Sequence, residues 1–313
     1  MARHVKIATL APPVITPKTK TADAVAFMRQ HWQACADCVL PEKPDLILLP
    51  EVCDHYPCKT NEEQDAYYRQ RGNTILNLWV DIARRNRCNV AYSAFREDKG
   101  KWYNSIQMID RSGNIIGIYN KMHPTIGAVE KNHNQYGDGA VVIKCDFGTV
   151  GGVLCFDLNF DDLRLQYVNL RPDLLLFSSW FHGGFLQNCW AYSCRAHFVS
   201  AVAGSPSVIM TPVGTTIAAT TNYRWYAVGT VNLDCCLAHY DFNRNHFTDM
   251  KHKYGDGVQI HDPGWLGSVL ITNELPDMTI DDLCREFGIE KLDDYFARCR
   301  QHRQDHYKPT QRI

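Results

Sequence analysis

The 313-residue sequence lacks any apolar run that approaches the roughly 20 residues needed to span a bilayer. It also has little excess charge of either sign, because 33 Lys and Arg oppose 34 Asp and Glu. That balance offers no basic surface field for nucleic acid or for an anionic membrane, so we expect neither as a partner. The first apolar stretch ends at Pro12, which is too early for a signal peptide, and we expect a soluble cytoplasmic protein.

The sequence also lacks a metal-binding pattern. It has no HExxH motif, and Cys35-Ala-Asp-Cys38 is a CxxC motif without a second matching pair. The 13 cysteines are an odd number, and in a reducing compartment most of them should pack as small hydrophobic thiols. We therefore expect no metal. The alternative is a metalloenzyme, which would contain stoichiometric zinc.

Short apolar runs alternate with longer stretches of helical period. The runs that indicate strands are residues 5–10, 45–49, 88–94, 105–109, 115–119, 150–155, 173–178, 207–210, 216–219 and 227–233. The stretches that indicate helices are residues 21–39, 61–86, 185–202 and 279–300. Such an alternation is typical of an α/β fold.

One phrase of the sequence occurs twice, as Lys43-Pro-Asp-Leu-Ile-Leu-Leu-Pro and as Arg171-Pro-Asp-Leu-Leu-Leu-Phe-Ser. A strand and a helical stretch precede each copy, and a helix and a hairpin follow it. Gly113 and Gly214 supply the positive φ that the two hairpin turns need. We interpret this as two β-α-β-α-β-β halves of one domain, residues 1–240. Chance likeness between short apolar strands is the alternative.

The composition changes after the last predicted strand. Residues 240–313 are rich in His, Tyr and Asp and are interrupted by glycine and proline. We expect this segment to have little core of its own. Residues 241–313 would then form a C-terminal extension that packs on the domain or on a partner subunit, with the last ten residues frayed.

Three reactive side chains follow predicted strands: Glu51, Lys121 and Cys155. A thiol with a pKa near ~8.5 needs a base or a cation to become a nucleophile, and Glu51 and Lys121 would supply both. The N–H of Phe156 would add an oxyanion donor. The alternative, for each residue taken alone, is that Cys155 is a buried core thiol and that Glu51 and Lys121 form an ordinary salt bridge.

These residues lie in segments that resemble the nitrilase superfamily of carbon–nitrogen hydrolases. The segments are Leu48-Leu-Pro-Glu51, Tyr103-Asn-Ser105 through Lys121, and Gly151-Gly-Val-Leu-Cys155-Phe-Asp157. The resemblance covers roughly residues 4–235. It implies a four-layer α-β-β-α sandwich with pseudo-twofold internal symmetry, assembly as a homodimer or larger homo-oligomer, and no metal or organic cofactor.

The resemblance also implies roles for single residues. Glu51 matches the general base, Lys121 the oxyanion-stabilising lysine and Cys155 the nucleophile of the family. Glu130 is the natural match for a second glutamate that positions the lysine.

The expected substrate is a small amide or carbamoyl compound, cleaved through a Cys155 thioester. Asp157 follows the nucleophile at the point where the nitrilase branch typically has Cys-Trp-Glu, so we favour amides over nitriles. The residues expected to line the substrate pocket are Tyr56, Trp180, Phe181, His182 and Asp157. A nitrilase is the first alternative, and a non-catalytic binding protein on the same scaffold is the second.

Overall fold

The computed structural model describes residues 1–15 and 21–308. The chain divides into two compact units. One unit is Val5–Val231, and the other combines Met1–His4 with Asn232–Ile313. Within the described ranges, no helix has the length and apolar character required to cross a membrane.

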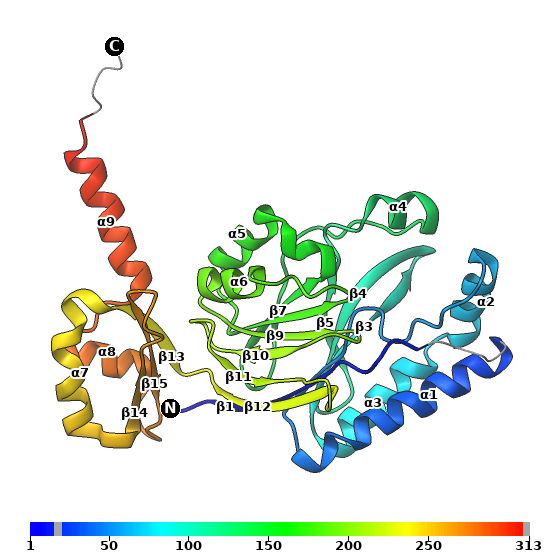
Figure 1. Cartoon of the computed structure of the whole chain (residues 1–313), viewed down its shortest axis with the longest axis horizontal. Coiled ribbons are helices and arrows are strands. Elements are labelled where there is room, and N and C mark those ends of the chain that lie inside the picture. The colour runs from blue at the N-terminus through cyan, green and yellow to red at the C-terminus, as the bar shows by residue number, and fades with distance from the viewer. Residues whose placement is uncertain (16–20, 309–313) are drawn as a thin grey trace. The chain divides into compact units, whose positions relative to one another are not determined.

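Two six-stranded sheets lie at the centre of the Val5–Val231 unit (Figure 1). The first has the order β12-β1-β2-β3-β4-β5, with β12 (Tyr226–Asn232), β1 (His4–Leu10), β2 (Leu46–Leu48), β3 (Asn89–Asp98), β4 (Lys101–Ile109) and β5 (Ile115–Asn120). The second has the order β11-β10-β9-β8-β7-β6, with β11 (Thr216–Ala219), β10 (Val208–Met210), β9 (His197–Val202), β8 (Leu174–Ser179), β7 (Thr149–Leu154) and β6 (Val142–Lys144).

The two sheets repeat one strand arrangement. In the first, β1, β2 and β3 are parallel and lead into the antiparallel pair β4 and β5. In the second, β7, β8 and β9 lead in the same way into β10 and β11. The inner faces are in contact: the Thr9 hydroxyl donates to the Ser200 carbonyl at 2.6 Å, and the Ser178 hydroxyl to the Leu49 carbonyl at 2.7 Å. The predicted internal duplication is confirmed.

Helices cover the outer faces of both sheets (Figure 1). α1 (Thr21–Asp37) and α3 (Thr74–Asn86) lie against the first sheet, and α5 (Asp161–Leu170) and α6 (Leu186–Cys194) lie against the second. The apolar face of α3 is buried as its spacing predicts, and its Trp79 packs against Trp32 of α1 at 5.9 Å between ring centroids. The expected four-layer sandwich is therefore confirmed.

Two predicted helices of this unit are interrupted. Residues 61–86 form α2 (Asn61–Arg71) and α3, because Gly72 leaves the helix with a φ of +46° that a side chain would disfavour. Residues 185–202 form α6 and then strand β9, whose six residues are all buried between β8 and β10. The sequence His-Phe-Val-Ser-Ala-Val therefore takes the conformation that its position in the sheet favours.

Three short elements complete the unit. They are a 3-10 helix (Leu40–Glu42), α4 (Ile126–Asn132) and a 3-10 helix that begins at the cysteine (Cys155–Asn159).

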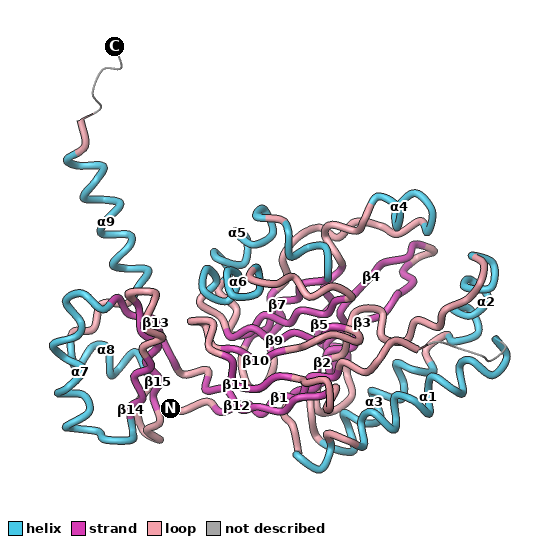
Figure 2. Tube along the Cα trace, in the orientation of Figure 1, coloured by secondary structure: helices cyan, strands magenta, loops and turns pink. Residues whose placement is uncertain are grey.

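The C-terminal unit has a core of its own, so that prediction is wrong. Its sheet has the order β13-β15-β14, with β13 (Cys235–His239), β15 (Ser268–Asn273) and β14 (Val258–His261). Figure 2 shows α7 (Tyr240–Tyr254) and α8 (Ile280–Phe287) beside this sheet. Val269, Ile271 and Leu283 are fully buried there. The consecutive apolar residues Val269, Leu270 and Ile271 of β15 were the signal for this core.

The end of the chain departs from the predicted single helix over residues 279–300. Gly288, with a φ of +65°, ends α8, and α9 (Leu292–His306) follows. A 3-10 helix (Gly255–Gly257) joins α7 to β14. Of the last ten residues, which were expected to fray, 309–313 lie outside the described residues, whereas α9 continues to His306.

Candidate active site

The ends of three strands bring Glu51, Lys121 and Cys155 to one place. Glu51 lies shortly after β2, Lys121 directly follows β5, and Cys155 directly follows β7. β5 and β7 contact each other although they belong to different sheets, because the two sheets are packed face to face. The fold thus brings together residues that are separated by up to about a hundred positions in the sequence.

Glu51 and Lys121 form a buried ion pair. The Lys121 Nζ donates to the Glu51 Oε1 at 2.7 Å, and both side chains are only 6% exposed. Burial disfavours the ammonium, but the charges of Glu51 and Cys155 and the hydrogen bond to Glu51 outweigh it and raise the pKa of Lys121. Lys121 is therefore a cation at neutral pH, next to the thiol.

The Cys155 thiol lies half-buried within the field of both charges. Burial raises its pKa, as does the negative charge of Glu51, whereas Lys121, the Trp180 N–H and the Ser179 hydroxyl act in the opposite direction. The net effect is a pKa above that of an ordinary thiol. The resting side chain consequently keeps its proton and needs a base before it can attack a carbon atom.

The backbone at the site is strained. Cys155 has a φ of +50°, and Val52, next to Glu51, has a φ of +46°. Residues with a Cβ rarely adopt a positive φ, and a β-branched valine does so least readily. Such strain persists only where the surroundings hold it, and it is concentrated at functional sites. Each turn positions a reactive side chain shortly after a buried strand.

Asp157 holds the turn that presents Cys155. Its carboxylate accepts the Leu154 N–H at 3.1 Å, the His123 N–H at 2.7 Å and the Tyr119 hydroxyl at 2.6 Å. The side chain is fully buried. Asp157 was predicted to contact substrate, but these bonds give it a structural position beneath the turn.

Asn104 is a site residue that the sequence argument did not assign. It lies on β4 and is 5% exposed; its side-chain amide donates to Glu51 Oε1 at 2.8 Å, and its carbonyl accepts the Lys121 N–H at 2.8 Å. It therefore fixes both members of the ion pair. The signal was present as a polar residue in a buried strand, inside the Tyr103-Asn-Ser105 segment.

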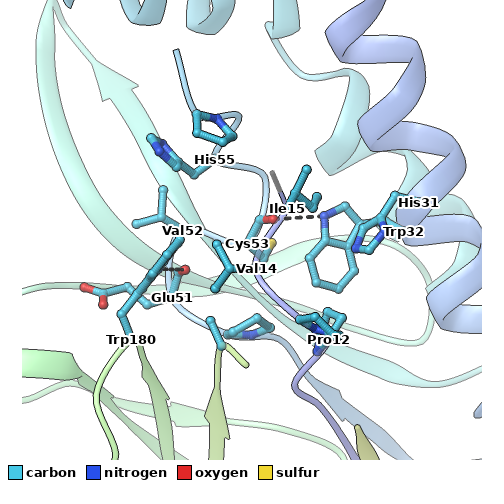
Figure 3. A pocket seen from close by; sticks show the side chains of 14 residues that line it. Pro12, Val14, Ile15, His31, Trp32, Glu51, Val52, Cys53, His55 and Trp180 are labelled. Atoms are coloured by element: carbon cyan, nitrogen blue, oxygen red, sulfur yellow. Dashed lines mark hydrogen bonds between the residues drawn. The ribbon is translucent and has the colours of Figure 1, made fainter. Parts of the chain in front are cut away.

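Trp180 contacts the backbone of Glu51 and also borders a cavity. Its indole N–H donates to the Glu51 carbonyl at 2.7 Å, and its ring lines a cavity of about 410 Å³ (Figure 3). Phe181 and His182 follow it, and neither lines this cavity. Phe181 is half-buried and packs edge-on against Phe177, whereas the His182 side chain is exposed.

The remaining predicted residues have mixed positions. Phe156 begins the turn after the nucleophile, so its N–H lies at the start of the 3-10 helix, while its side chain is 39% exposed. Tyr56 is buried and packs against Tyr67 in the core, and only its neighbours line the cavity. Glu130 is exposed on α4, and the structure gives it no contact with Lys121.

In the described part of the chain, no group of three or more His, Cys, Asp or Glu side chains is arranged to hold a metal ion.

Comparison with known proteins identifies relatives of this chain. Residues 7–236 match the family model of the carbon-nitrogen hydrolases. The citrullinase of Francisella tularensis is 28% identical over 177 residues, which is 54% of this chain and 60% of that protein. A probable nitrilase of Schizosaccharomyces pombe is 28% identical over 142 residues, which is 44% of this chain and 51% of that protein. The matches thus span between half and three-fifths of these two relatives.

Solved structures share the fold. The NitFhit protein of C. elegans superposes with a TM-score of 0.64 at 18% identity and covers 81% of this chain and 66% of its own. An amidase from Nesterenkonia sp. gives a TM-score of 0.61 at 15% identity and covers 80% of this chain and 97% of its own. The family match over most of the chain, on this fold, shows that the protein belongs to the carbon-nitrogen hydrolase family.

Proposed function

We propose that the protein is an amidase that cleaves the C–N bond of a small amide or carbamoyl compound through a Cys155 thioester. The observation that carries the proposal is the buried contact of 2.7 Å between Glu51 and Lys121, beside a thiol that retains its proton. A protonated thiol, a carboxylate and a cation are the three groups that nucleophilic acyl transfer requires.

The first half-reaction forms the thioester. Glu51 accepts the thiol proton while Cys155 Sγ bonds to the amide carbon, and the carbonyl oxygen becomes an anion. Lys121 and the Phe156 N–H stabilise that anion, and one such donor is typically worth about 3 kcal/mol of barrier. Glu51 then passes the proton to the departing nitrogen, the C–N bond breaks, and ammonia or an amine leaves.

The second half-reaction restores the enzyme. Glu51 accepts a proton from a water molecule whose oxygen attacks the thioester carbon. The C–S bond breaks, the proton returns to Cys155 Sγ, and the acid leaves. Asn104 keeps Glu51 Oε1 fixed through both halves, so the carboxylate need not reorient.

The names of relatives support amides as the substrate class. They include citrullinase, deaminated glutathione amidase and N-carbamoylputrescine amidase. A solved structure of a mutant of the amidase from Nesterenkonia sp. shows Michael addition of acrylamide at the active-site cysteine of that protein. A relative named as a probable nitrilase keeps nitriles as an alternative substrate class.

The test is a screen of matched primary amides, carbamoyl compounds and nitriles, with ammonia release as the measurement. The amides or carbamoyl compounds should yield ammonia, and Cys155→Ala should abolish it while its circular dichroism stays that of the wild type. Turnover of nitriles alone would establish the nitrilase alternative. Failure of every substrate, together with a Cys155 that alkylates no faster than the other cysteines, would favour a binding protein.

We also propose that the protein assembles as a homodimer or larger homo-oligomer, as its resemblance to the family implies. Light scattering should give a mass that is at least twice that of one chain, and the mass of one chain would reject the proposal. We further propose that the C-terminal unit packs either on the Val5–Val231 unit or on a partner subunit. Chemical cross-linking of the same preparation, with the linked peptides identified by mass spectrometry, would distinguish the two.

A further inference from the structure

The Val5–Val231 unit contains another cavity, which lies along the hairpin of β3 and β4 and has a volume of about 570 Å³. Its lining residues come from 68–76, at the end of α2 and the start of α3, and from 92–107 of the hairpin. We call it the hairpin cavity. Glu51, Lys121 and Cys155 do not line it, so it is separate from the candidate active site. Its volume lies in the range of small-molecule sites.

The hairpin cavity contains a buried amide that has no protein partner. Gln107 lines the cavity, lies on β4 opposite Tyr92 of β3, and is 4% exposed. Within the described residues its side-chain amide makes no hydrogen bond, whereas polar groups at such depth normally make one. An amide can both donate and accept, so this part of the cavity suits an uncharged polar group of a ligand.

Arg96 lines the cavity farther along the same face of the hairpin. Side chains alternate between the two faces of a strand, so Arg96, four residues after Tyr92, points to the same side as Tyr92 and its partner Gln107. At a rise of about 3.4 Å per residue, the separation along the strand is about 14 Å. The Arg96 side chain is 18% exposed, and its Nη1 contacts Asp98 at 3.3 Å. Its Nε is buried without a hydrogen-bond partner in the described part of the chain and suits an anionic oxygen.

The charge of the lining is weakly positive. Arg69 and Lys99 line the cavity, and no ion pair of either is found within the described residues. Glu97 is the acidic residue of the lining. Arg71 also lines the cavity, but its guanidinium is already paired with Asp54 at 2.9 Å. This small excess of positive charge favours a ligand with a single negative charge over a cation.

Aromatic rings supply an apolar part of the lining. Tyr68, Phe95 and Trp102 line the cavity, and the Tyr68 centroid lies 5.5 Å from that of Phe95 and 5.8 Å from that of Trp102. Phe95 and Trp102 are half-buried, so both rings keep surface that a ligand can cover. Apolar or aromatic atoms of a ligand gain free energy from that contact.

We propose that the hairpin cavity is a binding site for an extended organic monocarboxylate that has an apolar or aromatic body and an uncharged polar group at its far end. The carboxylate accepts a hydrogen bond from Arg96, the body lies against Phe95 and Trp102, and the far group bonds to the Gln107 amide. The ligand is extended because Arg96 and Gln107 are separated along the hairpin. The proposal does not rest on the amidase function, because no residue of the proposed mechanism lines this cavity.

The test is isothermal titration calorimetry of the wild-type protein with three ligands of one shape. They are 3-(4-hydroxyphenyl)propanoate, 3-phenylpropanoate, which lacks the hydroxyl, and 3-(4-hydroxyphenyl)propan-1-ol, which lacks the carboxylate. The hydroxy acid should bind with a Kd of about 1 mM or below, the alcohol at least about tenfold more weakly, and the phenyl acid at least about threefold more weakly. An alcohol that binds as tightly as the hydroxy acid, or a hydroxy acid that does not bind at millimolar concentration, would overturn the proposal.

Two variants test the two ends of the ligand separately. In Arg96→Gln, the advantage of the hydroxy acid over the alcohol should fall at least about fivefold. In Gln107→Leu, which keeps the size of the side chain and removes its amide, the advantage over the phenyl acid should disappear. Because the Arg96 side chain is partly exposed, Arg96→Gln tests the proposal even if Gln107→Leu does not fold.

The control variant is Arg85→Gln, which removes an exposed cation of α3 that does not line the cavity. It should leave all three affinities within about twofold of the wild type. Circular dichroism establishes that each variant is folded. Advantages that stay unchanged in folded Arg96→Gln and Gln107→Leu would place the ligand elsewhere and overturn the proposal.

Discussion

At the scale of single residues, Cys155 and Lys121 are both protonated before substrate binds, for different reasons. Cys155 keeps its proton, because burial and the negative charge of Glu51 raise the pKa of its thiol. Lys121 keeps its proton because the neighbouring negative groups outweigh burial. The resting site thus holds a protonated thiol beside the ion pair of Glu51 and Lys121, and the proposed reaction begins with proton transfer from sulfur to Glu51.

Replacing Glu51 by Gln tests this electrostatic arrangement. Because a negative neighbour disfavours the thiolate, its removal should lower the pKa of Cys155 and move the midpoint of alkylation to lower pH. The rate of iodoacetamide addition is followed from neutral to alkaline pH by peptide mass spectrometry, with the exposed Cys189 as internal reference. A midpoint that stays in place or rises would contradict the assignment.

Asn104 is expected to act as a positioning residue. Asn104→Leu removes the donor to Glu51 Oε1 and should lower kcat by about ten- to a hundredfold, since a hydrogen bond to a charged group is worth about 1.5–3 kcal/mol. It should also shift the pH midpoint of Cys155 alkylation, because the Glu51 carboxylate loses a stabilising bond.

The control for Asn104→Leu is Ser105→Ala on the same strand. The Ser105 hydroxyl donates to Asn120 at 2.7 Å and does not contact Glu51. This variant should leave the alkylation midpoint unchanged. If Asn104→Leu keeps kcat within about twofold of the wild type, the positioning role is wrong.

Among the elements, the loop after β2 carries Glu51, the proposed general base. Asp54 lies on it and is fully buried, where it binds Arg71 at the end of α2 at 2.9 Å and accepts the Tyr92 hydroxyl from β3. The Tyr67 hydroxyl of α2 donates to the Asp54 carbonyl at 2.7 Å. Helix and strand thus fix the loop from two sides.

Asp54→Asn should destabilise the fold strongly, because it leaves the buried Arg71 guanidinium without its counter-charge. Breaking such a pair costs about 3–5 kcal/mol, measured as a lower denaturant midpoint. Asp81→Asn, which removes an exposed partner of Arg84 and Arg85, should cost less than about 1 kcal/mol. Equal losses in the two variants would show that the buried network does not stabilise the loop.

At the same scale, the sequence identifies some elements better than others. The repeated Pro-Asp-Leu phrase identifies β2 and β8, because buried parallel strands are apolar on both faces. The sequence pattern of residues 185–202 does not separate α6 from β9, since an apolar run fits a buried helix as well as a central strand. Asn104 could not be assigned because its partner, Glu51, is fifty-three positions away and meets it only through the sheet.

At the scale of the whole molecule, the chain forms two compact units, and the one that contains Asn232–Ile313 has a core of its own. In the sequence, the end of the Val5–Val231 unit is indicated only by the enrichment in His, Tyr and Asp after residue 240. The core of the C-terminal unit was missed because its three strands are short and because the fifteen residues of α7 lie between β13 and the other two.

Ile271→Ala tests whether the C-terminal unit depends on that core. Ile271 is fully buried in β15, and its truncation should cost about 2–5 kcal/mol within this unit. Hydrogen exchange should then accelerate for the amides of β13 and β15, while those of β7 and β8 keep their protection. Equal acceleration in both units would contradict two separate cores.

The central claim is that Cys155 carries the acyl group during turnover. The direct measurement is an acid quench of the enzyme during hydrolysis of an amide that the substrate screen identifies, followed by peptide mass spectrometry. The account predicts the acyl group of that amide on the peptide that contains Cys155 and none on the corresponding peptide of Cys155→Ala. Turnover without an adduct on Cys155, or with the adduct on another cysteine, would contradict it.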